Sequence, residues 1–476
     1  MCLYMQQTYF LMKKKLVLFI TGCFVLMLSS CLGSDEVDYE LSKDCQILTF
    51  SLSSDSIPGL DKVVFTIDQL NGRIFNADSM PYGTDLRDGM VICNVKLAST
   101  VWSCEVMQEA KGDTIQWNLQ DSLNFSKPVK FVNHLWDFET AKTTKTYIAQ
   151  LNIHQVVPDS MVWALYADEI ADEAIKEEKT VVFGDANAEY YYMYMQPANT
   201  SKGYQLYRSP VSDGKNWTSQ PLTGLPAGEV RLSQIAEMGD YLYVVTTKGA
   251  LYRSANGMDW ALVENTPSIK SLLGSVKAND DFTGAGKQTS ALATVIDTDG
   301  KLTIASMNKS LEWKSGVEVP AGFPMSNFGN VSYNSMFRAR LMLVAGRDKS
   351  NNLLNSSWAT EDGIIWAMLT DSEANLFEKQ EGVSVVEYDE KFFMLSGING
   401  AGKASSAIYL SKDGGVNWNV SDTLVVMPTD FKPRGFTSIC VDQHNFMYLF
   451  GGKETTNSNV LDQIWRGRIN RLGFKD

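Results

Sequence analysis

Short apolar segments alternate with polar turns along most of the chain, a pattern typical of β-structure. In residues 37–155, seven β-rich segments are separated by turn signals such as Pro58-Gly59 and Asn71-Gly72. These segments are 47–52, 63–67, 90–95, 101–106, 114–117, 129–132 and 146–153. Seven short strands in this span predict a β-sandwich.

The rest of the chain contains an internal repeat, Ser/Thr-x-Asp/Asn-Gly-x-x-Trp with small variations. Each copy follows two strand-like segments, such as YLYVV at 241 and LYRS at 251. The acidic or amide side chain can accept hydrogen bonds from its own turn, and the tryptophan can pack against the neighbouring repeat. We therefore interpret the motif as structural. Its carriers are Asp213, Trp217, Asn256, Trp260, Asn308, Trp313, Asp362, Trp366, Asp413 and Trp418.

The repeat count predicts an all-β protein whose second domain, residues 157–476, is a six-bladed β-propeller. The last strand-like segment, 464–469, has no Asp turn and no tryptophan strand after it, whereas Asp159 and Trp163 have the motif's spacing ahead of the first repeat. We expect residues 157–167 to close the last blade and 180–476 to form the blades. The acidic segment 168–179, rich in Ala, Glu and Lys, predicts a linker helix, either solvated or partner-binding.

The N-terminus predicts a lipoprotein signal peptide over residues 1–30. Three lysines precede an apolar run at 16–28 that is too short to span a bilayer, and Leu28-Ser29-Ser30-Cys31 resembles the bacterial lipobox. A start at Met12 would give a more compact leader. Lipidation of Cys31 would anchor the chain to the membrane through a tether, residues 31–36. The pair Asp35-Glu36 is similar to the surface-export signal of Bacteroidetes lipoproteins. We expect localisation at the outer membrane, where the chain is either displayed on the cell surface or faces the periplasm.

The net charge bears on the kind of partner, and the cysteine and histidine content bears on disulfides and metal sites. The net charge is −13, and loss of the three leader lysines would make it −16, which disfavours nucleic acid as a partner. Among Cys45, Cys93 and Cys104 at most one disulfide can form, and Cys93–Cys104 is our first choice. With three histidines and no paired-cysteine motif in the chain, we expect neither a metal site nor a cofactor.

Several segments also carry family resemblances. MPYGTDL at 80–86 and KTTKTYIAQLNIH at 142–154 resemble the Ig-like modules of Bacteroidetes lipoproteins, and YLFGG at 448–452 resembles a kelch blade. The Asp turns are similar to the Asp boxes of sialidase-type propellers. The whole chain thus resembles Bacteroidetes lipoproteins in which an Ig-like domain precedes a kelch or galactose-oxidase-like propeller. A galactose-oxidase copper site needs two histidines and two tyrosines, but the propeller region holds only His444.

The candidate site lies in long polar loops that should connect the second and third strands of each blade. The side chains we select there are Lys202, Arg347, Asp348, Asn351, Lys403 and Lys453. Their amines, amides and carboxylates could bind a glycan or an envelope protein, and we expect a binding function. A carbohydrate-active enzyme that uses carboxylates in the propeller funnel is the first alternative, since such pairs leave no linear motif. A purely structural scaffold is the second.

Overall fold

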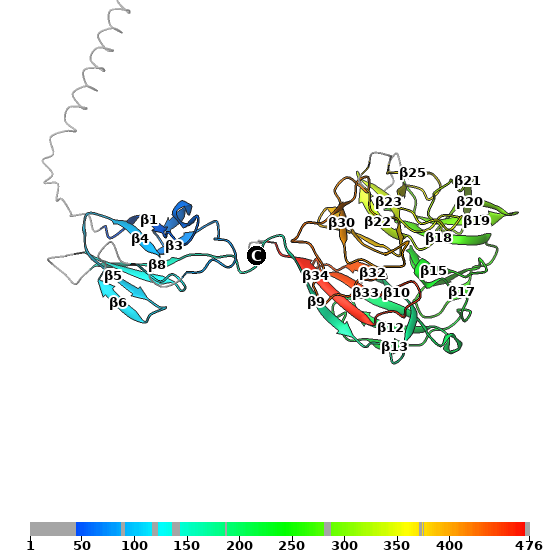
Figure 1. Cartoon of the computed structure of the whole chain (residues 1–476), viewed down its shortest axis with the longest axis horizontal. Coiled ribbons are helices and arrows are strands. Elements are labelled where there is room, and N and C mark those ends of the chain that lie inside the picture. The colour runs from blue at the N-terminus through cyan, green and yellow to red at the C-terminus, as the bar shows by residue number, and fades with distance from the viewer. Residues whose placement is uncertain are drawn as a thin grey trace, which may run out of the picture. The chain divides into compact units, whose positions relative to one another are not determined.

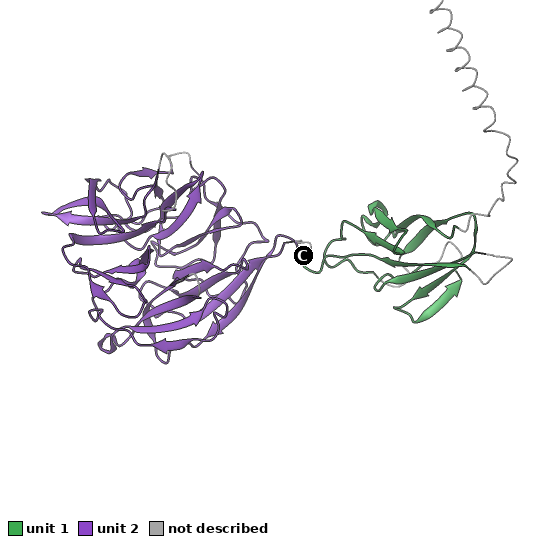
Figure 2. Cartoon of the chain, turned by 180° about the vertical axis from the view of Figure 1, so that it is seen from behind, with its two compact units in different colours: residues 1–156 green, residues 157–476 purple. Residues whose placement is uncertain are grey.

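The computed structural model describes residues 44–86, 91–116, 122–135, 143–185, 188–279, 287–370, 374 and 376–471 (Figure 1). The chain divides into two compact units, residues 1–156 and 157–476 (Figure 2). The expected signal peptide, Cys31 and the tether lie outside the described residues. Within the described ranges, no helix is long and apolar enough to cross a membrane.

The first unit contains two β-sheets that share one hydrophobic core. Strand β1 (Ile47–Ser53) pairs with β4 (Ile92–Leu97), and the second sheet has the order β2-β3-β8-β7-β5-β6. Phe50 of β1 contacts Phe65, Phe125 and Phe131 edge-to-face and so joins the two sheets. The remaining elements are β2 (Phe65–Asp68), β3 (Arg73–Asn76), β5 (Val101–Gln108), β6 (Asp113–Gln116), β7 (Val129–Leu135), β8 (Thr144–Gln150) and the 3-10 turn η2 (Leu60–Lys62).

Two features of this unit differ from expectation. Strand β3, four residues long, was not predicted, and it pairs parallel with β8. The disulfide Cys93–Cys104 is also wrong, because both cysteines are free thiols buried in the core. Burial raises the pKa of the Cys104 thiol to about 12, so both sulfurs serve as apolar packing groups.

The second unit contains six four-stranded antiparallel sheets, each with its strands mostly in chain order. The first five are β10 (Ile175–Asp185), β11 (Ala188–Pro197), β12 (Gln205–Pro210) and β13 (Thr218–Gln220); β14 (Ala236–Met238), β15 (Tyr241–Val245), β16 (Leu251–Ser254) and β17 (Ala261–Leu262); β18 (Ser268–Val276), β19 (Ala291–Thr298), β20 (Lys301–Asn308) and β21 (Trp313–Glu318); β22 (Gly329–Ser335), β23 (Arg338–Val344), β24 (Ser357–Thr360) and β25 (Trp366–Met368); and β27 (Ser384–Tyr388), β28 (Lys391–Leu395), β30 (Ile408–Ser411) and β31 (Asn419–Val420).

The sixth sheet combines segments from both ends of the unit. Strands β32 (Gly435–Val441), β33 (Met447–Lys453) and β34 (Gln463–Ile469) are followed in the sheet by β9 (Met161–Asp168), which pairs antiparallel with β34. Trp163 of β9 lies over Gly467, where an added Cβ would come within 2.4 Å of the indole. The segment around Trp163 therefore takes the outer position that the last repeat lacks. The other small elements are η3 (Thr200–Lys202), η4 (Leu232–Gln234), β26 (Gln380–Glu381) and β29 (Ile398–Asn399).

The predicted linker helix at 168–179 is wrong. Residues 169–174 form an irregular loop, and β10 begins at Ile175. In this loop the Asp462 carboxylate accepts the Ala171 N–H at 2.7 Å, and the side chains of Ile170 and Ala171 pack into a core cluster. Pairing of β10 with β11 over its whole length outweighs the helix propensity of Ala, Glu and Lys.

The Asp turns pin their own loops. Oδ1 of Asp362 accepts the N–H groups of Ile364 and Ile365, both at 2.8 Å, and the Trp366 indole donates to the Gly363 carbonyl. The Trp418 indole also reaches Ser357 Oγ, in the preceding sheet, at 2.9 Å. The motif thus fixes a turn and, at Trp418, ties two sheets together.

Candidate functional site

A polar channel runs among the innermost strands of the six sheets. Its wall is formed by β10, the η4–β14 segment, β18, β22, β27 and β32, and it encloses ≈ 670 Å³. Side chains of the wall also join neighbouring sheets. Ser275 Oγ donates to the Glu237 carbonyl at 2.5 Å, and Asn330 Nδ2 donates to the Leu273 carbonyl at 2.9 Å.

The same pattern continues where the last sheets meet the first. Ser384 Oγ of β27 donates to the Thr437 carbonyl of β32 at 2.6 Å. Ser438 Oγ of β32 accepts the Thr180 N–H of β10 at 2.9 Å, which links the last sheet to the first. These bonds hold the channel open with satisfied polar groups, so it is not plugged by apolar side chains.

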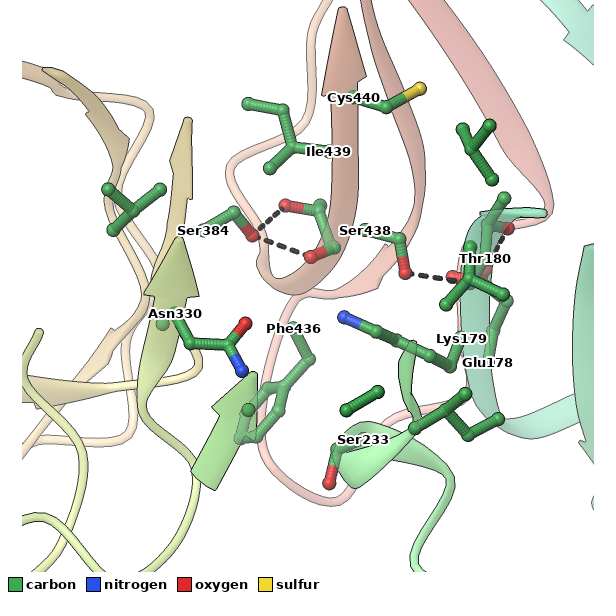
Figure 3. A pocket seen from close by; sticks show the side chains of 18 of the residues that line it. Glu178, Lys179, Thr180, Ser233, Asn330, Ser384, Phe436, Ser438, Ile439 and Cys440 are labelled. Carbon is green, nitrogen blue, oxygen red and sulfur yellow. Dashed lines mark hydrogen bonds between the residues drawn. The ribbon is translucent and has the colours of Figure 1, made fainter. Parts of the chain in front are cut away.

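Lys179 supplies a cation to the middle of the channel. Figure 3 shows its ammonium pointing into the cavity, with the Asn330 carboxamide directed toward it from another strand. In the described part of the chain, no side chain or carbonyl forms a hydrogen bond or ion pair with this ammonium. Desolvation by burial lowers the pKa of Lys179. The ammonium is thus available for an external anion.

Glu178, the preceding residue, also lines the channel, but its carboxyl group is bonded to Thr180 and not to Lys179. Its Oε1 accepts the Thr180 hydroxyl at 2.5 Å, and its Oε2 is buried without a hydrogen-bond partner. An added Cβ at Gly451 would come within 2.5 Å of Oε2, so this glycine makes room for the carboxyl group. Desolvation raises the pKa of Glu178 to about 7. At neutral pH, therefore, a full counter-charge for Lys179 is missing.

Phe436 is held in the channel wall by a strained backbone. Its φ of 59° lies in the left-handed region, which is costly for a bulky residue. The Phe436 N–H donates to the Gly382 carbonyl at 2.6 Å, and the ring covers Gly382 so closely that a Cβ there would lie 2.6 Å from it. The strain thereby places an aromatic ring in the wall of the channel that Lys179 also lines (Figure 3).

The channel wall carries further charged side chains. Glu237 is held by Lys277 at 2.6 Å. Lys453 is half-buried, and burial lowers its pKa while Glu177 opposes that shift. The described ranges contain no group of three or more His, Cys, Asp or Glu side chains that could hold a metal ion.

A basin of ≈ 790 Å³ adjoins the channel, and Glu177, Ser233 and Asn327 line both spaces. Amides, hydroxyls and the Tyr204 ring line the basin together with basic side chains. The charged residues of its wall are Lys176, Glu177, Arg231, Lys270, Asp348 and Lys349. Four cations against two anions make this surface basic in a chain of net charge −13.

The structure places the six residues selected from the sequence in different surroundings. Asp348 and Asn351 line the basin, and Lys453 lines the channel. Lys202 is bound to Glu173 at 3.0 Å, and Arg347 forms a two-pronged ion pair with Glu381. Lys403 borders neither space.

Sequence reasoning missed the residues at the heart of the site, namely Lys179, Asn330 and Phe436. Lys179 fell within the helix expected at 168–179. Asn330 and Phe436 are on innermost strands, which carry no repeat motif. Inward-facing polar residues on the first strand of each repeat would have been the signal.

The comparisons identify the family of both units and the fold of the second. A family profile described as the DUF6242 beta propeller domain matches residues 157–476, and a profile for the DUF6242 N-terminal domain, of unknown function, matches residues 39–151. The expected all-β fold with a β-propeller is thus confirmed. A search of curated proteins found no match.

Solved structures with similar folds share little sequence. YjhT is 13% identical over 62% of this chain and 95% of its own, with a TM-score of 0.42. An α-L-arabinanase of Penicillium chrysogenum, complexed with arabinobiose, is 12% identical over 65% and 98%, with a TM-score of 0.37. A lectin of Aleuria aurantia, in complex with α-methyl-L-fucoside, is 11% identical over 62% and 93%, with a TM-score of 0.39. TM-scores this low carry no argument about ligand or activity.

Proposed function

We propose that this chain, which belongs to the DUF6242 family and has a β-propeller domain over residues 157–476, is a glycan-binding protein of the cell envelope. The observation that carries this proposal is the basin, which combines amide, hydroxyl and ammonium groups with the half-buried Tyr204 ring. Sugars are bound by such mixtures of hydrogen-bonding groups and apolar faces, and the basin has the size of a small-molecule site.

Carboxylate placement supports binding over hydrolysis. A glycosidase needs two carboxyl groups that face each other across the substrate. Two of the carboxyl groups that line the channel are already engaged, Glu237 by Lys277 and Glu178 by the Thr180 hydroxyl. A wall of satisfied polar groups around an open channel also supports a ligand-binding role over a purely structural scaffold.

The predicted signal peptide supports a proposal for the cellular location of the protein. We propose that Cys31 is lipidated and anchors the chain in the outer membrane. The N-terminal unit, as an Ig-like spacer, would then hold the propeller away from the bilayer. The propeller itself would be a closed six-bladed ring, with β9 completing the last blade; the pairing of β9 with β34 supports this.

A glycan array and a reducing-sugar assay on the mature chain would test the function. We expect binding of an oligosaccharide without sugar release, and at least tenfold weaker binding by Lys349→Met, which removes a basin cation. Lys412→Met makes the same charge change on an exposed Asp turn outside the basin and is the matched control. Release of reducing sugar would favour the hydrolase. Equal binding by both variants, or none by the unaltered chain, would refute the proposal.

A further inference from the structure

The middle of the channel combines a free cation, an aromatic ring and an amide. We propose that this group, Lys179, Phe436 and Asn330, is a subsite for a carboxylate-bearing sugar of the uronic acid type. The inference rests on the proposed glycan-binding function and names the chemical class of the residue that enters deepest. In this arrangement the sugar carboxylate pairs with the Lys179 ammonium while one face of the pyranose ring covers Phe436.

The case for an anion begins with Lys179. Its ammonium lies in the cavity, and within the described chain no hydrogen bond or ion pair holds it. The adjacent carboxyl group of Glu178 accepts a hydrogen bond from the Thr180 hydroxyl and not from the Lys179 ammonium. An ammonium in a confined polar channel is stabilised by a counter-ion, because desolvation penalises the unpaired charge. A carboxylate of the ligand would supply that charge.

The case for a sugar rests on Phe436 and Asn330. A phenylalanine with φ of 59° is an outlier that persists only where the surroundings enforce it, and such outliers cluster at ligand sites. The strain turns an apolar face toward the same space as the ammonium (Figure 3). Asn330 gives its Nδ2 hydrogen to Leu273 and keeps its Oδ1 as an acceptor for a sugar hydroxyl.

Access and size are compatible with this ligand. Glu177, Ser233 and Asn327 border both the basin and the channel, so the two spaces adjoin each other. The channel volume of ≈ 670 Å³ exceeds what one monosaccharide needs and lies in the range of small-molecule sites. In the proposed arrangement, an acidic end residue pairs with Lys179 in the channel while further sugars of the chain occupy the basin.

Calorimetric titration of the mature chain with glucuronate, glucose and acetate is the test. We expect glucuronate to bind at least tenfold more tightly than glucose, and acetate to bind weakly. Lys179→Met should abolish the preference for glucuronate. Phe436→Gly, which suits the left-handed backbone, should weaken both sugars. Lys301→Met, which removes a lysine that is paired with Glu318 outside both the channel and the basin, should behave as the unaltered chain.

A second measurement separates this inference from the proposed function. NMR of the Lys179 side chain should show a raised ammonium pKa when glucuronate is added, because an adjacent carboxylate favours the charged form. No change in the Lys179 signals, with oligosaccharides still bound at the basin, would overturn the subsite and leave the glycan-binding function intact. Equal affinities for glucose and glucuronate would also overturn it. Loss of all oligosaccharide binding would instead refute the function.

Discussion

The buried carboxyl group of Glu178 predicts that the propeller is less stable above neutral pH. This side chain is only 9% exposed, and one of its oxygens has no hydrogen-bond partner. Its pKa in the folded chain is about 7, against an ordinary value of 4.5. Each pKa unit corresponds to about 1.4 kcal/mol, so ionisation of Glu178 costs the folded state about 3 kcal/mol.

The sign follows from proton binding. Below the ordinary pKa the carboxyl group is neutral in the folded and the unfolded chain. As the pH rises, the unfolded chain loses the proton first, so the free energy of unfolding falls until the pH passes about 7. Between pH values of about 5.5 and 8.5, Glu178 should therefore lower this free energy by roughly 2 kcal/mol.

Urea denaturation of the mature chain at several pH values, followed by tryptophan fluorescence, measures this loss. Glu178→Gln cannot ionise and keeps an oxygen that accepts the Thr180 hydroxyl. We expect the difference in unfolding free energy between the two chains to change by about 2 kcal/mol across that pH range. Glu177→Gln, which changes the neighbouring and less buried carboxyl group of the same strand, is the control and should follow the unaltered chain. Parallel pH profiles for the unaltered chain and Glu178→Gln would refute the reasoning.

Two further substitutions test the architecture in the same denaturation assay. Trp163→Ala should lower the free energy of unfolding by about 3 kcal/mol, because a buried indole is removed from the β9–β34 pair. Val162→Ala, on the exposed face of β9, should cost under about 1 kcal/mol, and equal losses would contradict a closing role for β9. Arg347→Met should cost about 3 kcal/mol, because it leaves the carboxylate of Glu381, which is 3% exposed, without its partner. Lys301→Met, which breaks an exposed ion pair, should cost under about 1 kcal/mol, and a similar loss in both would argue against a structural role for Arg347.

The outer parts of the propeller could be predicted from sequence because their residues repeat. Asp362 and Trp366 recur at a fixed spacing, since each turn must close the same loop and each indole must fill the same position. Even the discontinuous sixth sheet was recognisable, because Trp163 carries the motif ahead of the first repeat. A local constraint that recurs leaves a pattern in one sequence.

The channel could not be predicted in this way. Its residues come from six separate strands, and they converge only after the sheets pack. Lys179 and Phe436 share no sequence motif, and tertiary contacts decide the position of each side chain. Lys202 and Arg347 were selected from the sequence as binding residues, but each forms an ion pair within the protein. Lys202 pairs with Glu173, and Arg347 pairs with Glu381.

Strand β10 begins within the helix expected at 168–179, and this error concealed both the hydrogen bond between the first and last sheets and the position of Lys179 in the channel. In a helix, the side chains of Glu178, Lys179 and Thr180 would point in different directions around one turn. The acidic residues near them would then indicate a helix surface that is exposed to solvent. In a strand, successive side chains point to opposite faces, so Lys179 points to one face of β10 while Glu178 and Thr180 point to the other, where Gly451 of the last sheet makes room for the Glu178 carboxyl group. The hydrogen bond from the Thr180 hydroxyl holds that carboxyl group away from the Lys179 ammonium. The same alternation thus leaves the Lys179 ammonium in the channel with no ion pair among the described residues, where the acidic ligand proposed above would bind.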